Sequence, residues 1–242
     1  MDVWVAVRSE GVKGSGAEND PYDGSTRPYP AVSISNLTKS GTTATAATST
    51  DHGFATGDWV TISGVEVDPT NKPRDVYYLG TFMISVTGPR EFTYQMLYEP
   101  FSSAAPGSAK TCCRERELFD TLMRAMPANT AVHLSPGVFE TKGMSWEVRT
   151  WQVKPGQKIL GSGIDVTTVK LVGSEAPEVR YFAIGAFYTT YLHDVEVADF
   201  TVDCNLTGQP GPYVTCDAVN LNGGHIRIRR IRAINWGSHS QT

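Results

Sequence analysis

The chain has 242 residues, of which 40% are hydrophobic and 19% charged, and its formal net charge is −4. This length and apolar fraction allow a sizeable buried core and exclude a mostly disordered chain, while frequent glycine (23) and proline (14) favour many short strands and turns. We therefore expect an all-β protein. Because its net charge is negative, the chain lacks the basic field that attracts nucleic acid or an anionic membrane, and we expect neither as a partner.

The N-terminal part combines a strand, a turn-rich run and a β module. Residues 2–8 alternate between apolar and polar side chains, and residues 11–26 are a long run of turn formers. From residue 31 the chain becomes rich in Thr, Ser, Val and aromatic residues, and short turns separate four expected strands, near residues 42–48, 58–63, 78–86 and 91–97. We therefore predict a small antiparallel β domain, with its linker, over residues 31–109.

One segment has the periodicity of a helix. From Arg114 to Met126 the apolar residues recur at spacings of three and four, and Pro127 marks the end of the pattern. Strand edges and apolar interior at the end of a stacked β structure need a cover. We expect this helix to cap the open end of a β core.

Two segments near the C-terminus, residues 193–203 and 224–234, share one pattern at an offset of 31 residues. Each is a short alternating strand, a two-residue corner and a second short strand. The apolar positions that coincide are Val195 with Ile226, Val197 with Ile228, Phe200 with Ile231 and Val202 with Ala233. The same offset taken backwards reaches Ile164, Val166, Val169 and Leu171. Such a period indicates stacked repeats, and two strands joined by a corner favour a right-handed parallel β-helix.

The order of motifs resembles a known group. Leu118-Phe-Asp-Thr-Leu-Met123, Val132-His-Leu-Ser-Pro-Gly-Val-Phe-Glu-Thr-Lys-Gly143 and Ile159-Leu-Gly-Ser-Gly-Ile-Asp-Val-Thr-Thr-Val-Lys-Leu171 look like the N-terminal cap and first coils of the pectate-lyase-like superfamily. That group includes polysaccharide lyases, glycoside hydrolases and phage tailspikes. The resemblance implies a parallel β-helix built from residues 1–30 and 110–242, and carbohydrate as the partner.

The segment between these two parts resembles a small β module of phage tail and related bacterial proteins. The resemblance rests on Asp51-His-Gly-Phe-Ala-Thr-Gly-Asp-Trp-Val-Thr-Ile-Ser-Gly64, Tyr78-Leu-Gly-Thr-Phe82 and Phe92-Thr-Tyr94. In the pectate-lyase-like group a glycine- and Asp-rich stretch usually runs almost directly into the cap helix, and residues 11–26 resemble that stretch. That resemblance implies that the module is an insertion between the turn-rich run and the cap helix.

Polysaccharide chemistry on such a scaffold needs acidic pairs, or a base with neutralised carboxylates, on outward-facing strand positions. If Val195 and Val197 point inward, their outward neighbours are candidates. As catalytic residues we select Asp203 and Asp217. As substrate-binding residues we select Glu196, Arg227, Arg232 and Trp236. Trp146 and Trp151 could also stack on sugar rings, although each is more often part of a core.

A structural alternative accounts for most of these charges. The 31-residue offset places Asp194 opposite His225, Glu196 opposite Arg227, and Asp199 opposite Arg230. Opposite charges on adjacent coils would form a ladder, worth about 0.2–1 kcal/mol per pair. Asp203 faces Ile234 rather than a base, so it remains the stronger site candidate, against a role in stabilising the turn beside Asn205.

The four cysteines and five histidines have no metal-ligand spacing, so we expect no metal and no cofactor. A disulfide between Cys204 and Cys216 stays open. No segment resembles a signal peptide or approaches the ~20 apolar residues of a membrane span, and the localisation stays open between the virion and the extracellular space.

Two functions compete. One is a pectate-lyase-like lyase or glycoside hydrolase; the other is a non-catalytic tail-fibre or tailspike-like protein, structural or glycan-binding, for which a homotrimer would be compatible. An inactive fragment is a third alternative. The repeat becomes clear only shortly before Thr242, whereas this group builds its groove from middle coils, so we expect most catalytic apparatus to be absent or to lie in a continuation. The fold alone does not decide between an enzyme and a non-catalytic protein.

Overall fold

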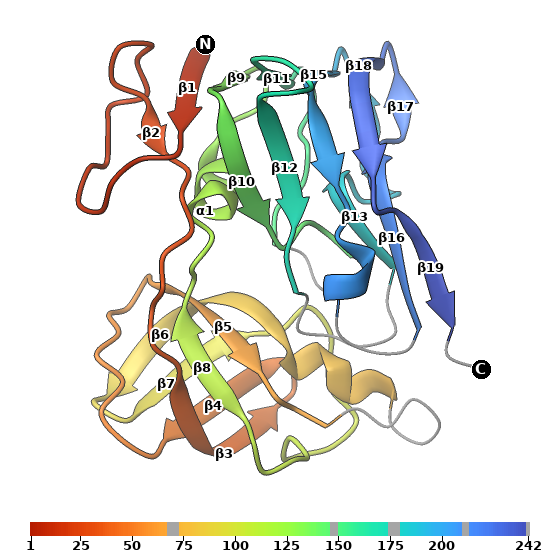
Figure 1. Ribbon diagram of the computed structural model, residues 1–242. Helices are drawn as coiled ribbons and strands as arrows, with labels where there is room; N and C mark the ends of the chain where they lie inside the picture. Colours follow the sequence, from red (N-terminus) through yellow and green to blue (C-terminus); the bar gives the residue numbers. More distant parts are fainter. Residues whose placement is uncertain (67–72, 146–149, 174–179, 210–212, 241–242) are drawn as a thin grey trace. The chain divides into compact units, whose positions relative to one another are not determined.

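The structure is a computed structural model that describes residues 1–66, 73–145, 150–173, 180–209 and 213–240 (Figure 1). The chain forms two compact units. The first consists of Met1–Arg27, Glu117–Gly173 and Val179–Thr242, and the second is built on Pro28–Arg116. Both consist mainly of strands, which confirms the prediction of an all-β protein.

The first unit contains a curled sheet of eight parallel strands, in which β9, β11, β15 and β18 lie side by side (Figure 1). Its strands are β1 (Asp2–Ala6), β2 (Tyr22–Asp23), β9 (Ala131–Leu134), β10 (Gly137–Thr141), β11 (Lys158–Gly161), β12 (Thr167–Leu171), β15 (Glu196–Asp203) and β18 (Arg227–Ile234). Two smaller sheets accompany it. One contains β13 (Arg180–Gly185), β16 (Tyr213–Asn220) and β19 (Gly237–Ser240), and the other pairs β14 (Leu192–His193) with β17 (Gly223–Gly224).

Apolar side chains stack in rows through this unit because neighbouring strands run parallel and in register. One row crosses five strands: Val3, Val132, Ile159, Val197 and Ile228. Its first four members are buried, whereas Ile228 on the last strand is 52% exposed. The 31-residue offset predicted the pairing of β15 with β18 correctly, including Phe200 with Ile231 and Val202 with Ala233.

The backward extension of that offset is wrong. Val197 pairs with Ile159, and Val202 pairs with Val169, so the offsets before β15 are 38 and 33 residues. The physical reason is the corner. β15 bends at Asp199 alone, whereas the loop after Gly161 separates β11 from β12 and carries the extra residues, among them Val166, which is exposed.

The helix α1 spans Leu118–Ala125, and Arg114, expected at its start, lies on a strand instead. Phe119 and Met123 are fully buried, and the ring of Phe119 lies 5.6 Å from that of Phe139 and 5.8 Å from that of Trp151. The apolar face of the helix therefore packs into the core of the first unit, as the periodicity predicted.

The second unit is a closed antiparallel barrel of six strands (Figure 1). They are β3 (Val32–Ser40), β4 (Thr43–Thr48), β5 (Trp59–Ser63), β6 (Gly80–Gly88), β7 (Glu91–Gln95) and β8 (Thr111–Arg114), with a 3-10 helix, η1 (Pro73–Tyr78), before β6. Four of the strands were expected from the sequence. β3 and β8 were missed, and β8 extends the unit beyond residue 109, where we expected the insertion to end.

All four cysteines are buried and none of them forms a disulfide, so the alternative of a Cys204–Cys216 disulfide is wrong. Burial raises the pKa of the thiols of Cys204 and Cys216 to about 12, which makes both behave as small apolar side chains. In the described part of the chain, no helix is long and apolar enough to cross a membrane.

Candidate functional site

The corners of β15 and β18 repeat the same backbone geometry. Asp194 and His225 precede the two strands with φ of 56° and 55°, and Asp199 and Arg230 interrupt them with φ of 69° and 45°. Such left-handed residues turn the chain sharply, and Asp tolerates this conformation better than most side chains. The 31-residue repeat is therefore a repeat of corners as well as of apolar rows.

The corner side chains of one strand pair with those of the next, as the ladder alternative predicted. Nη2 of Arg230 donates to Oδ2 of Asp199 at 2.7 Å. Nδ1 of His225 lies 3.4 Å from Oδ1 of Asp194, whose Oδ2 lies 3.1 Å from Nδ1 of His193. The hydrogen bond from His193 lowers the pKa of Asp194, and the hydrogen bonds from Arg230 lower the pKa of Asp199.

The third rung of the ladder differs from the prediction. Glu196 is in register with Arg227, but its Oε1 accepts a hydrogen bond from Nε of Arg229 at 2.6 Å. Arg229 lies two residues further along β18 and so on the same side of the strand, and a long arginine side chain can reach the diagonal carboxylate. This leaves Arg227 without an ion pair to any described residue.

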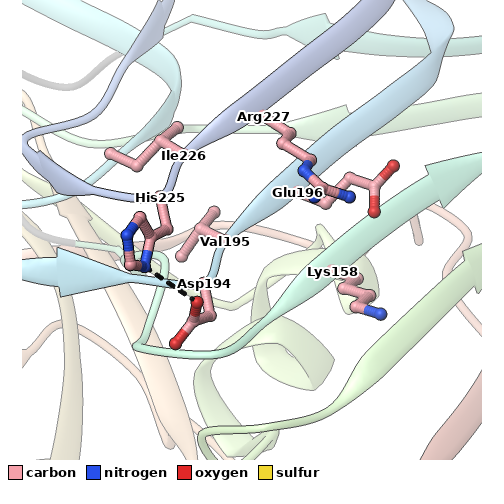
Figure 2. Close-up of a pocket in the computed structure, with 7 residues that line it drawn as sticks. All are labelled: Lys158, Asp194, Val195, Glu196, His225, Ile226 and Arg227. Atoms are coloured by element: carbon pink, nitrogen blue, oxygen red, sulfur yellow. Dashed lines mark ion pairs between the residues drawn. The ribbon is translucent and has the colours of Figure 1, made fainter.

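Lys158, Glu196 and Arg227 occupy one register position on β11, β15 and β18. They line an open groove of about 500 Å³ together with Asp194, Val195, His225 and Ile226. Figure 2 shows the three charged side chains extending from neighbouring strands, with the Asp194–His225 pair beside them at the corner. Within the described ranges Lys158 also makes no ion pair, so two exposed cations flank a carboxylate that is already neutralised.

Asp203, the preferred catalytic candidate, has partners at its own turn. Its Oδ1 accepts hydrogen bonds from the backbone N–H of Asn205 at 2.9 Å and from Nδ2 of Asn235 at 2.8 Å. Both donors belong to corner residues with left-handed φ. The carboxylate therefore joins two consecutive corners, which is the turn-stabilising role considered as its alternative.

Asp217 lies on another sheet. It is part of β16, where its Oδ2 accepts from Nε of Arg180 on β13 at 2.7 Å. Asp203 belongs to the eight-stranded sheet and Asp217 to the three-stranded one, so the two catalytic candidates lie on different sheets.

The other candidates are scattered. Arg232 pairs with Asp165 at 2.8 Å, and Trp236 is 66% exposed just after β18. Trp151 is buried and donates from Nε1 to the hydroxyl of Thr141 at 2.9 Å, so it belongs to the core. Trp146 lies outside the described residues. Of the six selected residues, the groove brings together only Glu196 and Arg227.

Lys158 lines the groove but was not predicted as a site residue from the sequence. It precedes Glu196 by 38 residues rather than 31, because the corner after β11 is longer than the corner in β15. The alternation in Gln157-Lys-Ile-Leu160 could have predicted it, because this pattern places Ile159 inward and Lys158 outward.

Replacing Asp199 with Asn tests the ladder. Asn tolerates the same left-handed backbone but cannot form the ion pair with Arg230. Because the folded-state pKa of Asp199 is lowered, its stabilising effect is present above the usual value of 3.8 and is lost as the pH falls through the folded-state value. We expect Asp199→Asn to melt at a lower temperature than the original chain at pH 7, and we expect this difference to be smaller near pH 2.5. Thermal unfolding followed by circular dichroism at both pH values measures this, and an equal gap at both would contradict it.

The described residues contain no group of three or more His, Cys, Asp or Glu side chains placed to hold a metal ion. No protein-family model matches the chain, and no curated protein is similar to it in sequence. Among solved structures, the tailspike protein gp49 from Pseudomonas phage LKA1 is similar at a TM-score of 0.24 and 11% identity. The match covers 84% of this chain and 42% of that one, so this chain spans less than half the length of the tailspike.

Proposed function

We propose that the first unit is the N-terminal part of a right-handed parallel β-helix and that the protein binds an acidic polysaccharide without cleaving it, as a tail-fibre or tailspike-like element. The observation that carries the binding proposal is the row of Lys158, Glu196 and Arg227 in the open groove.

The β-helix interpretation rests on how consecutive segments pair. After β15 the chain forms β16, β17 and β18, and each of these strands pairs in parallel with the strand one turn earlier: β16 with β13, β17 with β14, and β18 with β15. Three parallel pairings per turn are the pattern of a coil with three faces. Connections between parallel strands of one sheet are almost always right-handed, which supports the proposed hand.

The charge of the row of Lys158, Glu196 and Arg227 favours an anionic ligand, while the carboxylate of Asp194, at the corner of the groove, is paired with His193. Lys158 and Arg227 flank Glu196, which is neutralised by Arg229, so the row presents a net positive charge to solvent. The backbone positions of the two cations are roughly 10 Å apart, twice the spacing between neighbouring strands. An open groove with cations on two strands suits a chain of uronate or sulfated sugars better than a small enclosed molecule.

The carboxylates argue against glycoside hydrolysis. Glycoside hydrolysis needs two carboxyl groups across one bond, one of them kept protonated by a raised pKa. The pKa values of Asp194 and Asp199 are lowered instead, and Asp203 and Glu196 are held by hydrogen bonds to neighbouring corners and strands. The groove therefore offers binding charges, and its acidic side chains serve the scaffold.

Replacing both groove cations tests this function. We expect the intact chain to bind polygalacturonate or alginate in isothermal titration calorimetry, more weakly at higher ionic strength, and Lys158→Ala/Arg227→Ala to bind at least tenfold more weakly. Two charge-assisted contacts of about 1 kcal/mol each account for that loss. The matched control, Lys13→Ala/Arg74→Ala, removes the same charge from exposed positions outside the groove and should leave the affinity unchanged.

Two results would overturn the proposal. Equal affinity of the groove and control variants would exclude the groove as the binding site. Release of reducing ends or of unsaturated products from the same polysaccharides, abolished by Asp203→Asn, would make the protein an enzyme and restore Asp203 as its catalytic residue.

A further inference from the structure

The motif Asp51-His-Gly-Phe-Ala-Thr-Gly-Asp58 of the barrel has no part in the groove described above. It lines a second pocket, of about 160 Å³, which belongs wholly to the barrel unit. The residues around this pocket are Tyr29, Pro30, Val32, His52, Gly53, Phe54 and Arg114. Aromatic and apolar side chains thus form most of its wall.

The aromatic part of the wall is rigid. The ring of His52 stacks on that of Phe54 at 4.9 Å, and buried Phe92 meets both rings edge-on from the core, at 5.5 and 5.9 Å. The backbone N–H of Phe54 donates to Nδ1 of His52 at 2.9 Å, so the ring proton sits on Nε2, which donates to the carbonyl of Gly88 at 3.1 Å. These contacts fix Phe54, which is only half-buried, as a preformed platform.

The polar part of the wall is nearly neutral. Nη2 of Arg114 donates to Oδ2 of Asp58 at 2.9 Å, and the guanidinium lies 5.6 Å from the centre of the Tyr29 ring. Asp58 also accepts from the backbone N–H of Ala55 through the same oxygen. Nε of Arg114, which is buried, and Nη1 make no hydrogen bond to a described residue, so Arg114 keeps donors beside the aromatic platform, whereas Asp58 does not line the pocket.

We propose that this pocket binds one neutral pyranose ring. The apolar C–H face of such a ring packs on Phe54, with Tyr29 beside it, while its hydroxyl groups accept from Arg114. Because Asp58 balances the charge of Arg114, the pocket favours a neutral ring over an anionic one. This preference distinguishes it from the groove of Lys158 and Arg227. The proposal is independent of the acidic-polysaccharide proposal because the residues of the two sites belong to different units.

Saturation-transfer difference NMR on the full chain tests it, with methyl glycosides of glucose, galactose, mannose and N-acetylglucosamine as probes. We expect saturation of the ring protons of at least one glycoside, reduced at least fivefold in Phe54→Ala. Phe54→Leu keeps apolar packing against Phe92 and guards against loss of folding in the alanine variant; it should show the same reduction. Tyr98→Ala removes another exposed aromatic ring of the same unit, outside the pocket, and should leave the signal unchanged.

The outcomes separate the alternatives. Absence of saturation for all four glycosides, an unchanged signal in folded Phe54→Leu, or equal saturation of benzyl alcohol would overturn the sugar site. Stronger saturation of glucuronate than of the matching glucoside would overturn its preference for neutral rings. Lys158→Ala/Arg227→Ala should keep the full glycoside signal, so failure of the groove proposal leaves this result untouched.

Discussion

Phe200→Ala should lower the free energy of unfolding of the first unit by about 3–5 kcal/mol, the range for truncating a fully buried phenylalanine. Phe200 is completely buried and directly follows the corner at Asp199. It is in register with Ile231, and a methyl group added at Gly161 would come within 2.7 Å of its Cβ. Such close packing limits collapse around the cavity that alanine would leave. Since domains are stable by about 5–15 kcal/mol, this single change removes a large share of the total.

Urea unfolding followed by tryptophan fluorescence measures this effect. Trp4 and Trp151 lie in the first unit, and Trp59 lies in the barrel. A variant that lacks Trp59 therefore shows which unfolding transition belongs to the barrel. Ile228→Ala is the control: it truncates an apolar side chain in the row of Val197, at its exposed end, and should change stability by less than about 0.5 kcal/mol. Similar losses for Phe200→Ala and Ile228→Ala would show that burial in this core does not set the cost.

The sequence could predict β15 and β18 because their corners have the same length. One residue, Asp199 or Arg230, turns each strand, so a single offset aligns the apolar rows and the corner charges. The same offset failed before β15, where the loop after Gly161 adds residues that no strand pattern reveals. That loop also kept Lys158 out of the predicted site. A register that depends on loop length cannot be extrapolated through a corner of another length.

Other errors arose where two patterns compete locally. The run Cys112-Cys-Arg-Glu-Arg-Glu117 ends in four consecutive charged residues and adjoins α1, yet its first three residues complete the barrel, with Cys112 facing Val32 and Ile62. Closure of the barrel outweighs local propensity here. For Glu196 the register was predicted correctly but not the partner, because the choice between Arg227 and Arg229 depends on side-chain conformation, which spacing alone does not determine.

Asp120→Ala should destabilise the cap by about 2–4 kcal/mol, because it would leave buried hydrogen-bond donors without their acceptor. Asp120, on α1, is fully buried, and its Oδ1 accepts from the hydroxyl of Thr141 at 2.5 Å. Its Oδ2 accepts from the backbone N–H of Lys142 at 2.8 Å. Thr141 in turn accepts from Nε1 of Trp151 and from the backbone N–H of Gly143. One carboxylate thus joins the helix to the end of β10 and to the core tryptophan.

The hydrogen-bond network of Asp120, Thr141 and Trp151 also predicts that substitutions at Asp120 and Thr141 are energetically coupled. Thr141→Val keeps the shape of the side chain but removes the hydroxyl, so Asp120 and Trp151 each lose a partner at once. In a double-mutant cycle the combined Asp120→Ala/Thr141→Val variant should lose less stability than the sum of the two single losses, by about 1 kcal/mol or more, because both changes break the same hydrogen bond. Additive losses would mean that Asp120 and Thr141 act separately. Strong coupling would establish that this polar contact, as well as the burial of Phe119 and Met123, fixes the helix to the parallel sheet. Burial of the two apolar side chains alone does not determine the position of the helix along β10.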